Sequence, residues 1–291
     1  MASKQSERLT VTSEIFDFFK KEAIDGSPGG KFVVLSRYEF VYPAYITSGE
    51  DNKKMKAQAL PVTKKDSHIK KEKEGVVVIE QQSATTLDLV GEQVWRGALL
   101  LADFIFHYPE IFKNANILEL ASGVGLTSIV ASMVAKKVLI TDVDRGDIFS
   151  LIDRNFKRNK ALVKAETLVK ELDFDNHATI DENSELLKDF PIILSADIIY
   201  NNQLTDLFFK TVLRLMSDPP NKILYVAQEK RYIFSLAFCY EYFLDRIEWL
   251  RSQNTSSINW TIEEVPIDFK QYFIYEKSEN LVLWKICAEL K

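Results

Sequence analysis

From about residue 90 onward, short apolar runs alternate with longer amphipathic segments. Apolar runs without internal alternation are typical of strands covered on both faces, and amphipathic segments are typical of helices. The pattern predicts strands at 116–120, 138–141, 167–169, 191–196 and 223–227, and helices at 91–108, 126–135, 147–160, 204–216 and 234–250. This alternation indicates a parallel sheet with helices on both faces, because parallel strands need long, right-handed crossovers.

Two more apolar runs, 258–262 and 281–286, follow the last predicted helix without a clear helical pattern between them. Parallel strands need a crossover element, so we expect these two strands to pair antiparallel. The sequence therefore predicts an α/β fold with a seven-stranded, mostly parallel sheet and an antiparallel C-terminal strand pair. We assign this domain to residues 90–291 and an N-terminal extension to residues 1–89.

The extension has a weaker pattern. A polar tail, 1–10, precedes a segment, 11–24, in which Ile15, Phe18 and Phe19 can share one side of a short helix. Residues 31–42 and 76–80 have the apolar and aromatic content of strands. The stretch 47–74 between them is polar and ends in a lysine-rich segment, 64–73. It is interpreted as a solvated loop, with a nuclear-targeting or partner-docking patch as the alternative.

The amino-acid composition argues against several classes of function. The 291 residues include 37 Lys and Arg against 42 Asp and Glu, for a formal net charge of −5, which argues against a wholesale nucleic-acid coat. Three histidines and two cysteines are few for a zinc ribbon or a disulfide scaffold. Cys239 and Cys287 have apolar neighbours, so we expect buried thiols in a reducing, intracellular compartment. From the polar N-terminal residues and the lack of a long apolar run we expect neither a signal peptide nor a membrane span.

The first core strand ends in Glu119-Leu-Ala-Ser-Gly-Val-Gly-Leu126. In open α/β sheets ligands bind beyond the carboxyl ends of the strands, and glycines there let a ligand approach the N–H groups of the next helix. The chain has only 10 glycines, and two of the last three, Gly123 and Gly125, stand at this turn. A ligand site is therefore favoured over the alternative, a tight turn without a ligand.

The residues around the turn indicate which ligand. Ser128 stands where a dinucleotide fingerprint has its third glycine, and the Glu119 carboxylate suits a cationic ligand better than a pyrophosphate. Asp142, at the end of the second strand, can accept hydrogen bonds from both hydroxyls of a ribose, although such an aspartate is often only a helix cap. S-adenosylmethionine carries a sulfonium and an ammonium and no phosphate, so Glu119 and Asp142 together favour it as the cofactor.

The ordered motifs 119–126, 141–142, 172–174 and 196–200 resemble those of the seven-strand, Rossmann-like protein-lysine methyltransferases, the methyltransferase-like group. The resemblance covers about residues 90–290, and segments 94–100, 229–231 and 275–284 narrow it within the group. It implies donor contacts from Trp95, Ala121, Ser122, Gly123, Asp142, Phe174 and Ala196, to which the turn motif adds Glu119 and Gly125. Two positions depart from the group: Ala121 replaces the usual first glycine, and Phe174 replaces a common tryptophan but keeps an aromatic plane for adenine.

Methyl transfer to an amine is an in-line displacement, so the enzyme has to align, desolvate and deprotonate the amine rather than supply a nucleophile. A lysine pKa near 10.4 has to fall, which an apolar channel promotes. Asp197 and Tyr200 leave the fourth strand beside the predicted donor site. Asp197 can accept a hydrogen bond from the amine, and the Tyr200 ring can stabilise the cationic product. In the alternative interpretation Asp197 caps the next helix and Tyr200 packs at the rim.

We therefore expect an S-adenosylmethionine-dependent protein-lysine N-methyltransferase that releases S-adenosylhomocysteine and needs no metal. Its partner is a protein that presents a lysine, and we expect a nuclear or cytoplasmic monomer without direct contact to a membrane or nucleic acid. One alternative is a methyltransferase acting on nucleic acid or a small molecule, although no Asn/Asp-Pro-Pro-aromatic tetrad is present. Another is a non-catalytic donor-binding scaffold, which the alanine at position 121 leaves open.

Overall fold

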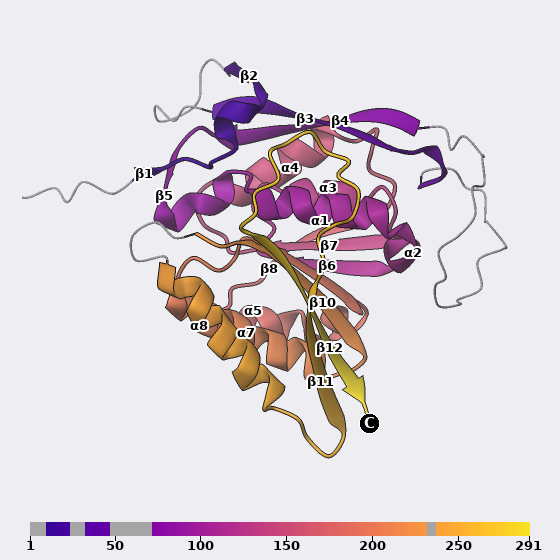
Figure 1. The fold of residues 1–291 in the computed structure, drawn as a ribbon, viewed down its shortest axis with the longest axis vertical. Coiled ribbons are helices and arrows are strands. Elements are labelled where there is room, and N and C mark those ends of the chain that lie inside the picture. Colours follow the sequence, from indigo (N-terminus) through magenta and orange to yellow (C-terminus); the bar gives the residue numbers. More distant parts are fainter. Residues whose placement is uncertain (1–9, 24–32, 47–71, 232–236) are drawn as a thin grey trace, which may run out of the picture.

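A seven-stranded sheet forms the centre of the molecule (Figure 1). The computed structural model describes residues 10–23, 33–46, 72–231 and 237–291. The strand order is β11-β12-β10-β9-β6-β7-β8. The strands are β6 (Asn116–Leu120), β7 (Lys137–Asp142), β8 (Glu166–Glu171), β9 (Ile192–Ala196), β10 (Lys222–Glu229), β11 (Ile258–Val265) and β12 (Leu281–Leu290). The strands from β6 to β10 pair in parallel, whereas β12 pairs antiparallel with both β10 and β11. The predicted sheet and its antiparallel C-terminal pair are confirmed.

Helices cover both faces of this sheet. One face carries α1 (Arg96–His107), α3 (Leu126–Ala131) and α4 (Ile148–Arg158), and the other carries α5 (His177–Glu182), α7 (Asn202–Ser217) and α8 (Ala237–Arg251) (Figure 1). The short helices α2 (Pro109–Phe112) and α6 (Ser184–Lys188) complete the set. Alternate strand residues point to opposite faces, so Ile117 belongs to one buried cluster and Leu118 to the other.

The N-terminal extension forms a second, three-stranded sheet in the order β2-β3-β4. Its strands are β2 (Lys20–Ala23), β3 (Val33–Pro43) and β4 (Glu72–Gln82). Tyr38, Phe40 and Ile79 are almost fully buried and share one hydrophobic cluster with α1 and α3. This sheet therefore packs against the helices of one face of the main sheet. The domain boundary at residue 90 stays a prediction.

The predicted helix over 11–24 is wrong. The described part of this segment contains the short strand β1 (Thr10–Val11), the single 3-10 turn η1 (Phe16–Phe18) and β2. β1 pairs with β5 (Thr85–Thr86) and β2 pairs with β3, so tertiary strand pairing overrides the local helical pattern. Ile15 and Phe19 are buried as expected, whereas Phe18 is exposed.

Two other boundaries differ from the prediction. The loop expected over 47–74 ends earlier, because Lys73 and Glu74 pair with β3 in the β4 ladder. Residues 47–71, with most of the lysine-rich segment, and the tail over 1–9 lie outside the described residues. The helix expected from residue 91 begins only at Arg96, and a 3-10 segment, η4 (Leu87–Glu92), precedes it. The cause is tertiary: the Gln93 side chain bonds to Ser13 and Thr85, which holds this stretch extended.

Other expectations agree with the structure. Cys239 and Cys287 are buried free thiols, as predicted. The predicted helices over 147–160, 204–216 and 234–250 correspond to α4, α7 and α8, and residues 234–236 lie outside the described range. The helix predicted over 126–135 corresponds to α3 but ends earlier, at Ala131. No helix in the described parts of the chain has the length and apolar character needed to cross a membrane.

Candidate active site

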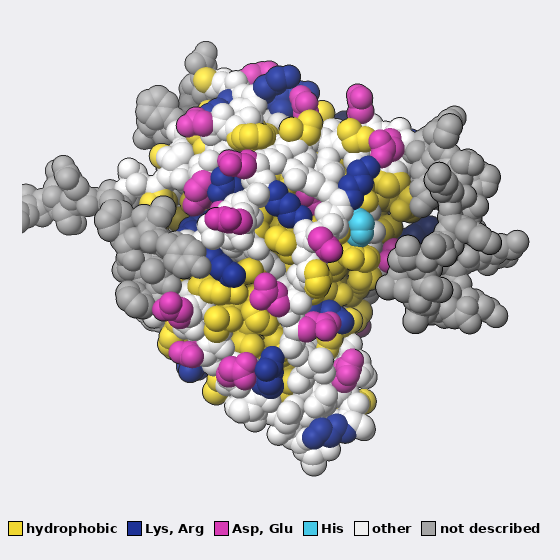
Figure 2. Space-filling view, in the orientation of Figure 1, with side chains coloured by type: hydrophobic (Ala, Val, Ile, Leu, Met, Phe, Trp, Pro, Cys, Tyr) yellow, Lys and Arg dark blue, Asp and Glu magenta, His cyan; other side chains and the backbone are white. Residues whose placement is uncertain are grey.

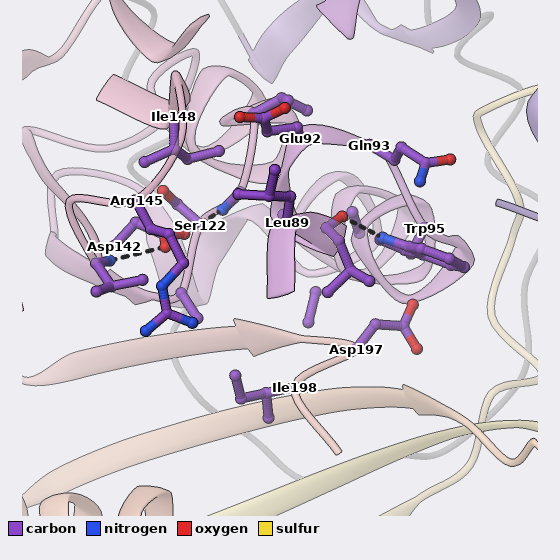
Figure 3. A pocket seen from close by; sticks show the side chains of 18 of the residues that line it. Leu89, Glu92, Gln93, Trp95, Ser122, Asp142, Arg145, Ile148, Asp197 and Ile198 are labelled. Atoms are coloured by element: carbon purple, nitrogen blue, oxygen red, sulfur yellow. Dashed lines mark hydrogen bonds between the residues drawn. The ribbon is translucent and has the colours of Figure 1, made fainter. Parts of the chain in front are cut away.

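A pocket opens at the carboxyl ends of β6, β7 and β9. From β6 the sheet extends to β7 and β8 on one side and to β9 and β10 on the other, so the strand order reverses at β6. This edge is the usual ligand position in an open α/β sheet. All of the predicted site residues except Gly125 line it: Trp95, Glu119, Ala121, Ser122, Gly123, Asp142, Phe174, Ala196, Asp197 and Tyr200. Figure 3 shows several of these side chains around one space.

The turn between β6 and α3 has an unusual backbone. Ala121, Gly123 and Gly125 have φ angles of 52°, 54° and 86°, in the left-handed region that glycine adopts most easily. A Cβ at position 123 would lie 2.8 Å from the carbonyl oxygen of Gly91, so this position also needs glycine for space. Ala121 adopts the left-handed conformation despite its side chain.

Gly125 lies at the helix end of this turn, and its predicted contact with the donor stays a prediction. It is the N-cap of α3, and a Cβ there would lie 3.3 Å from the Phe156 ring of α4. It is absent from the residues that line the pocket. Gly125 therefore shapes the turn by packing against α4, without lining the pocket.

The Asp142 carboxylate joins the end of β7 to the turn. One oxygen accepts the Gly123 N–H at 2.7 Å, and the other accepts the Val143 N–H at 2.8 Å. Burial raises the pKa of Asp142 to about 6, against the opposing effect of these hydrogen bonds and of Arg145. Asp142 does not cap α4, whose N-cap is Asp147. Because its pKa is about 6, the Asp142 carboxylate is mostly ionised at neutral pH, and its remaining lone pairs are available to a ligand.

The Glu119 carboxylate is buried beneath the same turn. It accepts a short hydrogen bond from the Ser128 hydroxyl of α3, and burial raises its pKa to about 7. Its negative charge is therefore only partly present at neutral pH. Above it, the Ser122 hydroxyl oxygen is buried in the pocket wall and has no hydrogen-bond partner among the described residues. Such a group is a natural contact for a polar ligand.

Asp197 occupies the end of β9 with a strained backbone, at a φ angle of 51°. One carboxylate oxygen accepts the Gly97 N–H at 2.6 Å, and the other accepts the Glu229 N–H at 3.0 Å. The Arg231 guanidinium lies 3.2 Å from this second oxygen. The interpretation of Asp197 as a helix cap is wrong, because the side chain of Asn201 caps α7.

Three aromatic residues predicted for the site, Trp95, Phe174 and Tyr200, line the pocket. Trp95 precedes α1 instead of lying within it, and its indole N–H donates to the Val90 carbonyl at 2.9 Å (Figure 3). The Arg231 guanidinium lies over the Trp95 ring at 4.7 Å. Burial raises the pKa of Tyr200 to about 12, so its hydroxyl stays neutral. Phe174 lines the pocket while it packs edge-to-face with Phe208.

The segment 88–94 forms a pocket wall that sequence reasoning missed. Glu92 in this wall accepts the Asp147 N–H at 2.8 Å, which ties the wall to the start of α4. Ile148 and Arg145 from the same region also line the pocket. The one signal in the sequence was Gly91, the first residue of the predicted helix, because glycine has a low helix propensity and so favours a later helix start.

A family model described as lysine methyltransferase matches residues 71–243, which include every predicted site residue. The chain belongs to the lysine methyltransferase family. The predicted resemblance is thereby confirmed. The chain is 35% identical over 235 residues to methyltransferase-like protein 22 of Homo sapiens, across 74% of this chain and 58% of that protein. It is 32% identical over 117 residues to the protein-lysine methyltransferase METTL21E of Mus musculus, across 39% of this chain and 46% of that protein.

A second methyltransferase-like protein 22, from Mus musculus, is 34% identical over 235 residues, across 74% of this chain and 60% of that protein. The chain therefore spans about three fifths of the length of both methyltransferase-like relatives. The matched family range begins just before β4, so it contains that strand of the extension as well as the main sheet through β10.

Proposed function

We propose that this member of the lysine methyltransferase family transfers a methyl group from S-adenosylmethionine to a lysine side chain of a protein. The observation that carries the proposal is that one pocket is lined both by Asp142 with the glycine turn and by Asp197 with Tyr200. The first pair suits a nucleoside donor and the second suits an amine acceptor. METTL21E, a relative at 32% identity, is itself named a protein-lysine methyltransferase.

The residues of the pocket fit the donor. Asp142 keeps lone pairs for ribose hydroxyls, and the unpartnered Ser122 hydroxyl offers a further polar contact. Phe174 offers an aromatic face for a purine. The bound donor would supply an electrophilic methyl group on a sulfonium. The chain has only to hold that donor, exclude water and present the amine, which requires neither a thiol nor a metal.

On the acceptor side, Asp197 is the residue that would orient the lysine. Its carboxylate is fixed by N–H groups from α1 and β10, so it can accept a further hydrogen bond without moving. The apolar faces of Trp95 and Ile198 lie beside it in the pocket (Figure 3). An apolar channel disfavours the ammonium form, so the amine would enter it more readily after losing its proton to water. The nitrogen lone pair then stays free to attack the methyl group, and the ring of Tyr200 can stabilise the cationic product.

A protein substrate agrees with the surface charge. Figure 2 shows acidic and basic side chains interspersed over one face, and the described residues of that face form no broad basic area. Nucleic-acid enzymes usually carry a basic stripe or patch. The proposal includes a nuclear or cytoplasmic location and a monomer, and the buried free thiols of Cys239 and Cys287 support a reducing compartment.

Two measurements test this function. Calorimetric titration should detect binding of S-adenosylmethionine and none of NAD. Tritiated methyl transfer into cell extract should label protein with the wild type and much less with Asp142→Ala or Asp197→Ala, whereas the exposed-site control Asp153→Ala should match the wild type. Label in RNA instead of protein, or equal label with all the variants, would refute the lysine proposal. NAD binding without donor binding would refute the methyltransferase assignment.

A further inference from the structure

The outer edge of β4 is paired with side chains of α4 instead of another strand. β4 is the last strand in the order β2-β3-β4. The side-chain amide of Asn155 accepts the Glu80 N–H at 2.7 Å and donates to the Glu80 carbonyl at 3.1 Å. Asn159, the C-cap of α4 and one turn further along, does the same with Val78, at 2.9 and 2.7 Å. Each amide supplies one donor and one acceptor, so together they imitate the backbone of a neighbouring strand.

Asn155 makes one more contact, which Asn159 lacks. Its amide nitrogen also donates to the Val124 carbonyl, at 3.0 Å, in the middle of the turn at 121–125. Asn155 is fully buried, so water does not compete for this bond. The amide nitrogen of Asn159 instead donates its additional bond to the Asn155 carbonyl within α4, at 2.8 Å. Two side chains with the same role toward β4 therefore differ in their contact with the turn.

A second connection runs from β4 to the other wall of the pocket. The buried Glu80 carboxylate pairs with Arg158 and, at 2.8 Å, with Arg154. Arg154 also pairs with Asp147 at 2.7 Å, and the Asp147 N–H donates to Glu92 in the pocket wall at 2.8 Å. β4 is thus joined through α4 to both the turn and the 88–94 wall.

We propose that Asn155 is a positioning residue for the methyl donor and that it makes β4 part of the donor site. Three residues of the turn have positive φ angles, and such a conformation persists only where the surroundings hold it. The Asn155 amide holds the Val124 carbonyl, which lies between Gly123 and Gly125. The Phe156 ring packs against Gly125. The proposal rests on the donor function proposed above.

The role of Asn155 is tested by measuring the affinity for S-adenosylhomocysteine by calorimetry. Thermal unfolding of the same variants is measured in parallel. Asn155→Ala should weaken donor-product binding by about tenfold, the effect of one lost buried hydrogen bond. Asn159→Ala is the matched control: it should lower the unfolding temperature similarly and change the affinity by less than about twofold. Asn155→Asp keeps the size of the side chain and its acceptor for Glu80 but has no N–H for Val124, so it should weaken binding as Asn155→Ala does.

Equal losses of affinity in Asn155→Ala and Asn159→Ala would overturn the proposal, as would wild-type affinity in Asn155→Asp. A wild type that fails to bind the ligand would instead refute the donor function, so the two failures are distinguishable. If neither Asn155 variant folds, hydrogen exchange in the wild type decides. Coupling is reciprocal, so the ligand should slow exchange of the Glu80 amide more than that of the Val78 amide, and equal slowing would reject the role of Asn155.

Discussion

Asp197 and Gly97 depend on each other at the acceptor side of the pocket. The Asp197 carboxylate accepts the Gly97 N–H at 2.6 Å, and a Cβ at position 97 would lie 2.7 Å from the same oxygen. The carbonyl oxygen of Ala227 would lie 3.0 Å away on the same side. The start of α1 therefore has room for Asp197 in its present place only while residue 97 is glycine.

Gly97→Ala should displace Asp197 and reduce methyl transfer at least about tenfold, because catalysis depends on the placement of the acceptor. The crowding should also lower the free energy of unfolding by about 1–3 kcal/mol. Donor affinity should change little, since Asp142 and the glycine turn lie on the other side of the pocket. Filter-binding transfer assays and donor calorimetry on the same preparation separate the two effects. Full activity in Gly97→Ala would show that Asp197 does not need this position.

Arg231 balances a group of carboxylates beside Asp197. It lies 2.9 Å from Glu14 and 3.2 Å from Asp197, and its side chain is only 13% exposed. Arg231→Gln leaves a buried carboxylate without its cation, so it should lower the free energy of unfolding by about 3 kcal/mol. Glu14→Gln removes a more exposed partner and should lower it by less than about 1 kcal/mol. Urea unfolding measures both, and a loss from Glu14→Gln as large as that from Arg231→Gln would contradict this account.

The main sheet was predictable because its central strands, β6, β7, β9 and β10, are buried on both faces. The run at 116–120 matches β6 residue for residue, since a short, mainly apolar segment between a loop and a glycine turn is typical of a buried strand. The segment 91–95 was not predictable, because its conformation depends on contacts between Gln93 and residues such as Ser13, far away in sequence. The N-terminal strand β2 was missed for the same reason: its partner in β3 decides its structure.

The site was predictable where chemistry requires a residue type. Carboxylates and glycines at strand ends indicated Asp142, Gly123 and Asp197, and all three line the pocket. Nothing in the sequence indicates a role for Asn155, since the residue type alone does not show whether an asparagine on a helix is buried or solvated. Only the structure shows that its amide lies between β4 and the donor turn.

Asp103, within α1, should make the stability of the fold depend on pH. It is fully buried, its carboxylate accepts the Tyr272 and Phe273 N–H groups at 2.7 and 2.9 Å, and burial raises its pKa to about 7. A pKa raised from 3.8 means that the folded chain binds the proton more tightly than the unfolded chain. The stabilisation from Asp103 is therefore complete below about pH 4 and lost as the pH rises through about 7.

Asp103→Asn keeps the acceptor oxygen for both N–H groups and carries no charge. At pH 8 this variant should be more stable than the wild type by about 1–2 kcal/mol, and its stability should depend less on pH between 5 and 8. Urea unfolding at several pH values measures this, with the exposed Asp153→Asn as the control. A variant that is less stable than the wild type at pH 8 would show that the charged carboxylate is the stabilising form.

Donor affinity should also depend on pH, through Asp142. Its pKa of about 6 means that the carboxylate is mostly ionised at pH 7.5 and mostly protonated at pH 5.5. The protonated form is a weaker acceptor for the Gly123 N–H and for ribose hydroxyls, so the wild type should bind S-adenosylhomocysteine several-fold more weakly at the lower pH. Asp142→Asn should bind weakly at both values, without this change. Glu119, whose pKa of about 7 is also raised by burial, titrates in the same range, so Glu119→Gln is the necessary control. If Glu119→Gln loses the pH dependence while Asp142→Asn keeps it, the titrating group is Glu119 and the assignment to Asp142 is wrong.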